Sequence, residues 1–193
     1  MNAEETYCFI KERFRIINKK KVHFIYLNEL DTQSICLDFK LCQDIERVWI
    51  NFNKEDFKKI TIKNGPKEIH AMFKISDLSP AKNIELDIQG KNVRRINLAC
   101  CNIHKINLNT PFLSSLNLPN NSLQKIEVES NYLEFCDLSN NQLLSAEINC
   151  KDIKDLLLSK NNLNSKSLNL SNFNEKKLRL TSFDSNFIFY EKN

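Results

Sequence analysis

Cysteine and histidine are the residues of this chain best suited to metal binding or nucleophilic chemistry, and the sequence holds seven cysteines and three histidines. A zinc site draws Cys and His ligands from short, regular spacings. His23, His70 and His104 each stand apart from any other residue at such a spacing. The adjacent Cys100 and Cys101 point to opposite faces if the chain is extended. We therefore expect no metal site.

Catalysis by a cysteine would require a histidine base and an electropositive setting. Cys136 falls instead at an apolar position of the repeat described below, where packing accounts for it. The chain has no glycine-rich phosphate loop and no Ser-His-Asp arrangement that the spacing supports. We expect no catalytic residue, no cofactor and no enzymatic activity.

The cysteine pattern also bears on the cellular compartment. The number of cysteines is odd, and none forms a C-x-x-C pair. Residues 1–5 are acidic and polar, unlike the basic and apolar start of a secretory signal. No apolar run approaches the roughly 18 residues of a membrane span. These features predict free thiols in an intracellular, cytoplasmic setting, which for a viral or effector protein is the host cytoplasm, and no membrane partner.

The charge balance is mildly basic, with 28 Lys and Arg against 24 Asp and Glu. Nucleic-acid-binding proteins concentrate basic residues in a stripe, and the only cluster here is Lys19-Lys20-Lys21. Those lysines are also what the C-terminus of a helix favours. The charge pattern argues against nucleic acid as the partner.

Asparagine recurs at a fixed interval that shows how the chain is organised. Asn121, Asn141 and Asn161 each follow a leucine by three residues. A buried amide can both donate and accept hydrogen bonds, so it can satisfy backbone groups that lose their strand partners at a corner. We predict that these three residues form a structural asparagine ladder. Cys101 occupies the same position one repeat earlier, where its thiol is a weak donor.

Aliphatic residues recur every ten positions between residues 93 and 163 and carry two further apolar positions at +3 and +5. The recurring positions are Val93, Ile103, Leu113, Leu123, Leu133, Leu143, Ile153 and Leu163. Ten residues are too few for a strand, a crossover helix and two turns. Each step is therefore one extended segment and a corner, and two steps make one coil of about twenty residues. Strands near 96, 116, 136, 156 and 178 should lie on one side, and strands near 106, 126, 146 and 168 on the other.

The N-terminal part is less regular. Residues 3–17 have an apolar face at helical spacing, and we predict a capping helix there. From residue 22, apolar pairs follow at about twelve-residue steps: Val48/Ile50, Ile60/Ile62, Phe73/Ile75 and Ile84/Leu86. We expect one domain with four parts: a capping helix in 1–21, divergent repeats in 22–92, regular repeats in 93–183 and a C-terminal cap in 184–193.

The segment Leu113–Leu123, with its counterparts Leu133–Leu143 and Ile153–Leu163, resembles the leucine-rich repeat family in its short variety of about twenty residues. The resemblance covers residues 93–183 closely and 22–92 loosely. Cys136 replaces an inner leucine, and Cys101 replaces the asparagine. The composition and short repeats also resemble the leucine-rich-repeat gene family of insect poxviruses. The expected fold is a mainly β repeat solenoid with extended segments on both sides.

Alternation along each strand separates inward residues from outward ones. In leucine-rich repeats the strand side faces the ligand, so the resemblance implies that the outward residues contact a partner. The predicted contact residues are Arg95, Asn97, Asn117, Phe135, Asp137, Asp155, Leu157, Lys177 and Arg179. Phe135 and Leu157 are apolar at outward positions beside two aspartates. That arrangement fits a contact patch, although scattered exposed apolar residues are also normal.

These observations favour a monomeric, non-enzymatic scaffold that recognises a partner protein through its strand face. Two alternatives remain. One is an adaptor or effector in a ubiquitin-type pathway. The other is a nucleic-acid binder that uses dispersed basic residues, namely Lys19–Lys21, Arg94, Arg95, Lys177 and Arg179.

Overall fold

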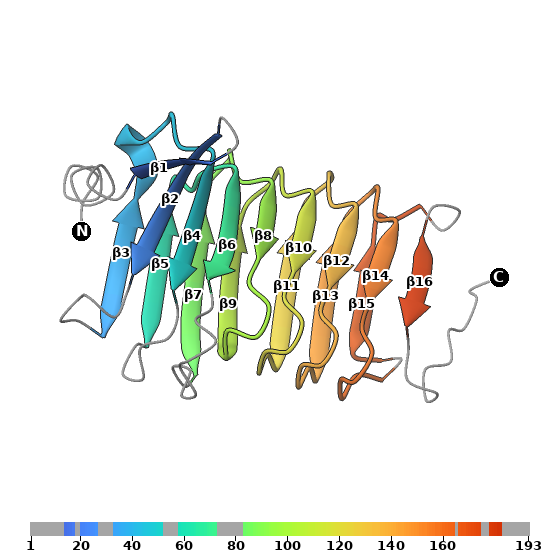
Figure 1. Ribbon diagram of the computed structural model, residues 1–193. Helices are drawn as coiled ribbons and strands as arrows, with labels where there is room; N and C mark the ends of the chain where they lie inside the picture. The colour runs from blue at the N-terminus through green and yellow to red at the C-terminus, as the bar shows by residue number, and fades with distance from the viewer. Residues whose placement is uncertain are drawn as a thin grey trace.

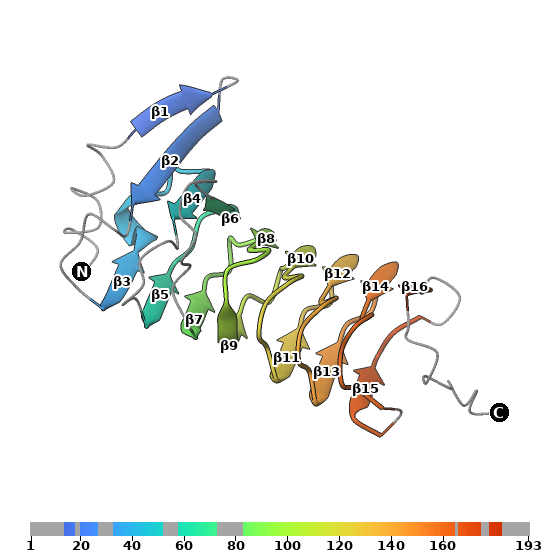
Figure 2. The ribbon, with the colours of Figure 1, turned by 60° about the horizontal axis from the view of Figure 1, so that its bottom comes forward.

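A computed structural model describes residues 14–17, 20–26, 33–51, 58–72, 83–164, 166–174 and 178–182. Figure 1 shows the strands standing side by side from the N-terminal to the C-terminal end, and Figure 2 separates them into two rows. From β2 onward, successive strands alternate between the rows, so the chain winds as a flattened solenoid. The prediction of a mainly β repeat solenoid is confirmed.

The first row is one nine-stranded sheet, which we call sheet A. It contains, in spatial order, β1 (Phe14–Ile17), β2 (Lys20–Tyr26), β4 (Arg47–Asn51), β6 (Glu68–Met72), β8 (Arg95–Asn97), β10 (Ser115–Asn117), β12 (Phe135–Asp137), β14 (Asp155–Leu157) and β16 (Arg179–Ser182). From β2 onward, all its neighbouring strands are parallel. The two-row order of the regular repeats is the one that the ten-residue steps predict.

The second row consists of two smaller parallel sheets. Sheet B contains β3 (Ser34–Asp38), β5 (Lys59–Lys63), β7 (Ile84–Gln89) and β9 (Ile103–Asn109), and sheet C contains β11 (Lys125–Glu129), β13 (Ser145–Asn149) and β15 (Leu168–Ser171). A short 3-10 helix, η2 (Phe39–Leu41), follows β3. Within the described ranges no other helix is present, and none has the length and apolar character of a membrane-spanning segment.

The core lies between the two rows and runs without a break through the described coils. The inward residues of successive strands, such as Ile50, Ile96, Leu116 and Leu156, are at most 1% exposed. Fully burying one such side chain contributes about 1.5–3 kcal/mol, whereas ordering the backbone costs about 1–2 kcal/mol per residue. One coil buries too few side chains to be stable alone, so the coils are stable only when stacked.

The three asparagines lie at one corner of the coil, which we call the asparagine corner. The Asn121 Oδ1 atom accepts hydrogen bonds from the backbone N–H groups of Cys101 (2.9 Å) and Ile103 (3.1 Å). Its Nδ2 group donates to the carbonyl oxygens of Leu98 (2.9 Å) and Leu118 (3.0 Å). Each amide thus ties its own coil to the preceding one. Asn141 and Asn161 repeat the pattern in the next two coils.

The opposite corner is built on small residues, and we call it the small-residue corner. Its positions in successive coils are Cys42, Gly65, Gly90, Thr110, Ser130 and Cys150. At each of these six positions the small residue's carbonyl oxygen accepts a backbone hydrogen bond, its N–H donates one to the next coil, or both. A Cβ atom on Gly90 would come within 2.6 Å of the Gly65 backbone nitrogen, so these two coils approach too closely for a side chain there.

The predicted capping helix over residues 3–17 is wrong in the part that the structure describes. Phe14–Ile17 is strand β1, which pairs antiparallel with β2 at the N-terminal edge of sheet A. The Ile16-Ile17 pair is β-branched and suits a strand. Lys20 and Lys21 belong to β2, so they do not follow a helix. Residues 1–13 lie outside the described residues.

The twelve-residue steps predicted for the N-terminal half are uneven in the structure. The distance in sequence between paired residues of neighbouring strands gives the length of each coil. Val22 pairs with Arg47, Arg47 with Glu68 and Glu68 with Arg95, so the first three coils have 25, 21 and 27 residues. The next three coils have 20 residues each. The inward residues of β6 are Ile69 and Ala71. The predicted pair Phe73/Ile75 and the predicted cap in 184–193 lie outside the described residues.

Candidate interaction surface

The outer face of sheet A is lined by the outward side chains of β4, β6, β8, β10, β12 and β14, and we call it the strand face. The strand register places these side chains in two parallel rows. One row is Arg47, Glu68, Arg95, Ser115, Phe135 and Asp155; the other is Trp49, His70, Asn97, Asn117, Asp137 and Leu157. All but Glu68, which is buried, are partly or fully exposed.

Near the C-terminal end, four of the predicted contact residues lie together on β12 and β14. Phe135 pairs with Asp155, and Asp137 pairs with Leu157. The two apolar residues therefore lie on one diagonal of this group of four, and the two acidic residues lie on the other. The Asp137 carboxylate accepts hydrogen bonds from the backbone N–H (2.9 Å) and hydroxyl (2.6 Å) of Ser139. We call these four residues the acidic apolar patch.

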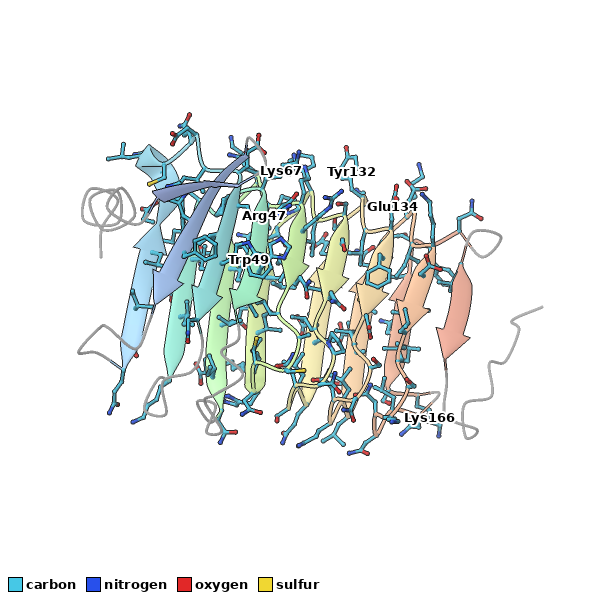
Figure 3. All side chains as sticks on the ribbon, in the orientation of Figure 1. Arg47, Trp49, Lys67, Tyr132, Glu134 and Lys166 are labelled. Atoms are coloured by element: carbon cyan, nitrogen blue, oxygen red, sulfur yellow. The ribbon has the colours of Figure 1, made fainter. Side chains whose placement is uncertain are left out.

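Near the N-terminal end, an aromatic and charged group occupies β4, β6 and β8, and Figure 3 shows Arg47 and Trp49 on this part of the sheet. The rings of Trp49 and His70 are stacked with centroids 4.8 Å apart. The Glu68 carboxylate, only 5% exposed, forms ion pairs with Arg47 and Arg95 (3.2 Å to Arg95) and lies 3.4 Å from His70 Nε2. We call this group the Trp49 patch.

Two pKa values in the Trp49 patch are shifted. Burial alone would raise the pKa of Glu68, but the hydrogen bond and charge of Arg47, helped by His70 and Arg95, hold it below its ordinary value. Burial lowers the pKa of His70, and the charges of Arg47 and Arg95 lower it further against the opposing effect of Glu68. At neutral pH, Glu68 is therefore ionised and His70 is uncharged.

The remaining predicted contact residues lie in the middle and at the end of the strand face. The Asn117 amide donates a 2.9 Å hydrogen bond to Asn97, which links β10 to β8. Arg95 is on the face but is engaged by Glu68. Arg179 is in β16, where its backbone pairs with Asp155, and Lys177 lies outside the described residues.

The sequence analysis missed the Trp49 patch because the N-terminal half lacks the asparagine repeat. A signal was nevertheless present. Trp49 stands between Val48 and Ile50, and alternation along a strand with those two residues inward places Trp49 outward. The outward positions of Glu68 and His70 could not be predicted in the same way. They alternate with Ile69 and Ala71, and an alanine gives only a weak indication of an inward position.

The basic residues considered for nucleic-acid binding do not come together. Arg95 is on the strand face, whereas Arg94 is at the small-residue corner beside Phe112, and Arg179 is at the far end of sheet A. Lys20 and Lys21 are at the N-terminal edge in β2. Lys19 and Lys177 lie outside the described residues.

Most thiols of the described part are buried in the core. Burial raises the pKa of Cys42 to about 11 and that of Cys150 to about 11, and it also raises the pKa of Cys101 and Cys136. These thiols are protonated at neutral pH. The Cys101 thiol donates a 3.3 Å hydrogen bond to the Ala99 carbonyl oxygen. In the described ranges no three His, Cys, Asp or Glu residues are grouped to hold a metal ion.

No protein-family model matches this chain, and neither curated proteins nor solved structures give a match. The structure establishes a β-solenoid of stacked coils. The resemblance to leucine-rich repeats therefore rests on the repeated motif and on the stacked coils themselves.

Proposed function

We propose that this protein is a non-enzymatic scaffold that binds a partner protein through the strand face. The observation that supports this most is the acidic apolar patch. Phe135 and Leu157 remain partly exposed on adjacent strands, on the side of the sheet opposite the core. Apolar side chains next to charged ones on a rigid surface are typical of protein contact sites.

The rigidity of the face also favours binding. Its strands are fixed in register by parallel backbone pairing, and the asparagine corner ties each regular coil to the next. A surface that is already ordered loses little conformational freedom when a partner binds. The Trp49 patch adds a tryptophan and two arginines, the residue types that most often dominate binding energy.

We further infer that the solenoid is of the short leucine-rich-repeat type and that the protein works as a monomer in the cytoplasm, in host cells if it is of viral origin. The repeated Leu-x-x-Leu-x-Leu-x-x-Asn-x-Leu spacing supports the first inference. Free thiols at Cys36, Cys100 and four buried positions are compatible with a reducing compartment.

The proposal is tested by an affinity capture from cell lysate with two matched variants. In the first, Phe135, Asp137, Asp155 and Leu157 are all replaced by alanine. In the control, four exposed residues of sheet C are replaced by alanine: Lys125, Glu127, Glu129 and Glu147. Circular dichroism establishes that both fold.

We expect proteins captured by the wild type and the control to be lost from the first variant, with the bound proteins compared by quantitative mass spectrometry. If the sheet C variant loses them instead, the binding surface is on the other row of strands. If all three proteins capture the same set, the strand face is not the binding surface.

A further inference from the structure

A second surface feature lies at the small-residue corner, next to the N-terminal coils. It is an open cleft of about 450 Å³. Lys40, Lys67, Lys91 and Arg94 line it, together with one carboxylate, that of Glu46. Figure 3 shows Lys67 on the edge of the solenoid that also carries Tyr132 and Glu134.

The four cations of the cleft have no carboxylate partner within the part of the chain that the structure describes. Some cations elsewhere on the solenoid do, whereas others in the described part, such as Lys63 and Lys105, also have none, so what distinguishes the cleft is that it gathers four of them. Lys154 pairs with Glu134 at 2.9 Å on the same edge, and Lys125 pairs with Glu127 at 2.6 Å. Positive charge that converges on a cleft and is left uncompensated attracts an anion.

Arg94 is held in place before any ligand arrives. Its guanidinium group donates to the carbonyl oxygens of Lys91 (2.7 Å) and Val93 (3.1 Å), and it stacks 5.0 Å from the Phe112 ring centre. Phe112 in turn packs against Tyr132, with centroids 5.3 Å apart. The ordering cost of this arginine is therefore already met in the free protein.

Carboxylates near the cleft are few: Glu46 lines it, and Asp44 and Asp38 lie close enough to Cys42, another lining residue, to raise the pKa of its thiol. Asp38 is occupied, since its Oδ1 atom accepts hydrogen bonds from the backbone N–H of Lys40 (3.0 Å) and the side-chain amide of Asn64 (2.8 Å). Among the lining residues, four cations stand against one anion.

We propose that this cleft binds a phosphorylated segment of the partner protein. The inference rests on the proposed function, because the segment belongs to the protein held by the strand face. A phosphate monoester carries close to two negative charges and three acceptor oxygens, which suits one guanidinium and three ammonium groups better than a single carboxylate does.

The cleft is continuous with the strand face. Lys67 and Arg94 immediately precede Glu68 and Arg95 in sequence, and the Lys67 carbonyl oxygen accepts hydrogen bonds from the N–H groups of Arg94 (2.9 Å) and Arg95 (3.1 Å). Glu68 and Arg95 belong to the Trp49 patch. A partner protein that covers the Trp49 patch would therefore also reach the cleft.

The experiment is an NMR titration of the full-length ¹⁵N-labelled protein with a short acetylated Gly–Ala peptide carrying one phosphoserine. We expect saturable shifts of backbone amides in residues 40–46, 64–67 and 91–94, and none with the unphosphorylated peptide. Lys67→Glu combined with Lys91→Glu should weaken binding at least about tenfold. Glu46→Gln should strengthen it, which a purely structural role would not produce.

Lys151→Glu is the matched control, because Lys151 follows Cys150 as Lys91 follows Gly90 in an equivalent corner. It should leave the affinity unchanged. The proposal is overturned if Lys151→Glu weakens binding equally, or if the shifts fall elsewhere. Inorganic phosphate binding as tightly as the peptide would reduce the cleft to a small-anion site, and tighter binding of single-stranded RNA would assign it to nucleic acid.

The result of the phosphopeptide titration can be distinguished from the result of the strand-face test. If the cleft fails to bind phosphopeptide while the alanine variant of the acidic apolar patch still loses its partner, only the phosphate inference is wrong. If that alanine variant keeps its partner, the proposed function itself is wrong.

Discussion

Asn141 shows how a single side chain stabilises two coils. Its Nδ2 group donates to Leu118 (2.9 Å) in the preceding coil and to Leu138 (3.0 Å) in its own, and its Oδ1 atom accepts from the Leu123 N–H (3.1 Å). The amide is buried, so water cannot replace it. The twenty-residue spacing alone was enough to place the three asparagines at one corner.

We predict that Asn141→Ala lowers the free energy of unfolding by about 1–3 kcal/mol, because it leaves buried backbone groups unpaired. The exposed neighbour Gln142 provides the control, and Gln142→Ala should change stability by less than about 0.5 kcal/mol. Urea unfolding followed by circular dichroism measures both. Equal losses of stability for the two substitutions would contradict a structural role for the asparagine ladder.

Backbone strain at the same corner leads to a second prediction. The position two residues after the last inward leucine has a positive φ, and it is occupied by Cys100 (56°), Asn120 (57°), Asn140 (52°) and Lys160 (55°). Asparagine tolerates this conformation better than cysteine does. Cys100→Asn should therefore stabilise the protein by about 0.5–1 kcal/mol, whereas Cys100→Ala should give no gain. A higher urea midpoint for the alanine variant than for the asparagine variant would contradict this reason.

The shifted pKa values of the Trp49 patch predict loss of stability in acid. His70 has a folded-state pKa below its ordinary 6.5 and Glu68 one below 4.5. A group with a depressed pKa contributes stability that is present above its unfolded pKa and is lost as the pH falls through the folded value. The unfolding free energy should fall below about pH 6.5 through His70 and again below about pH 4.5 through Glu68. His70→Gln should abolish the first part of the fall; an unchanged profile between pH 7 and pH 5.5 would contradict it.

At the scale of the element, the unit of this fold is one coil of two strands and two corners. The sequence predicted that unit in the regular half, because the residue at every tenth position, from Val93 to Ile153, is aliphatic and buried. It did not place β6, since the coils on either side of that strand differ in length and Ala71 is a weak inward signal. It also mistook β1 for part of a helix, because pairing with β2 overrides the helical spacing of four apolar residues.

The coil unit predicts which deletions the protein tolerates. Removing residues 123–142 joins Ser122 to Leu143, which occupies the position of Leu123 one coil later. The coils on either side of the deletion then stack directly on each other with equivalent contacts, so the variant should fold. Its stability should be lower, because one coil and one interface between coils are lost. Removing only residues 123–132 would move every later strand into the opposite row, and that variant should not fold. Circular dichroism and urea unfolding distinguish these outcomes, and a cooperative transition in the half-coil deletion would contradict the two-row arrangement.

At the scale of the whole molecule, the solenoid presents two unlike rows of strands. Sheet C exposes charged residues such as Lys125, Glu127 and Glu147, which suits a solvated surface. Sheet A exposes the Trp49 patch and the acidic apolar patch at its two ends. The sequence indicated the second patch through the resemblance and the alternation. Of the first patch, alternation indicates only that Trp49 points outward; the Glu68 network could not be predicted, because it depends on pairing between strands whose spacing is irregular.

The most direct test of the central claim is site-specific photo-crosslinking in cells, with p-benzoylphenylalanine introduced in place of Phe135, Trp49 or, as the control, Glu127. If the strand face binds the partner, the probes at 135 and 49 should crosslink to the same protein, and the probe at 127 on sheet C should not. Crosslinking from 127 alone, with none from 135 or 49, would contradict binding through the strand face.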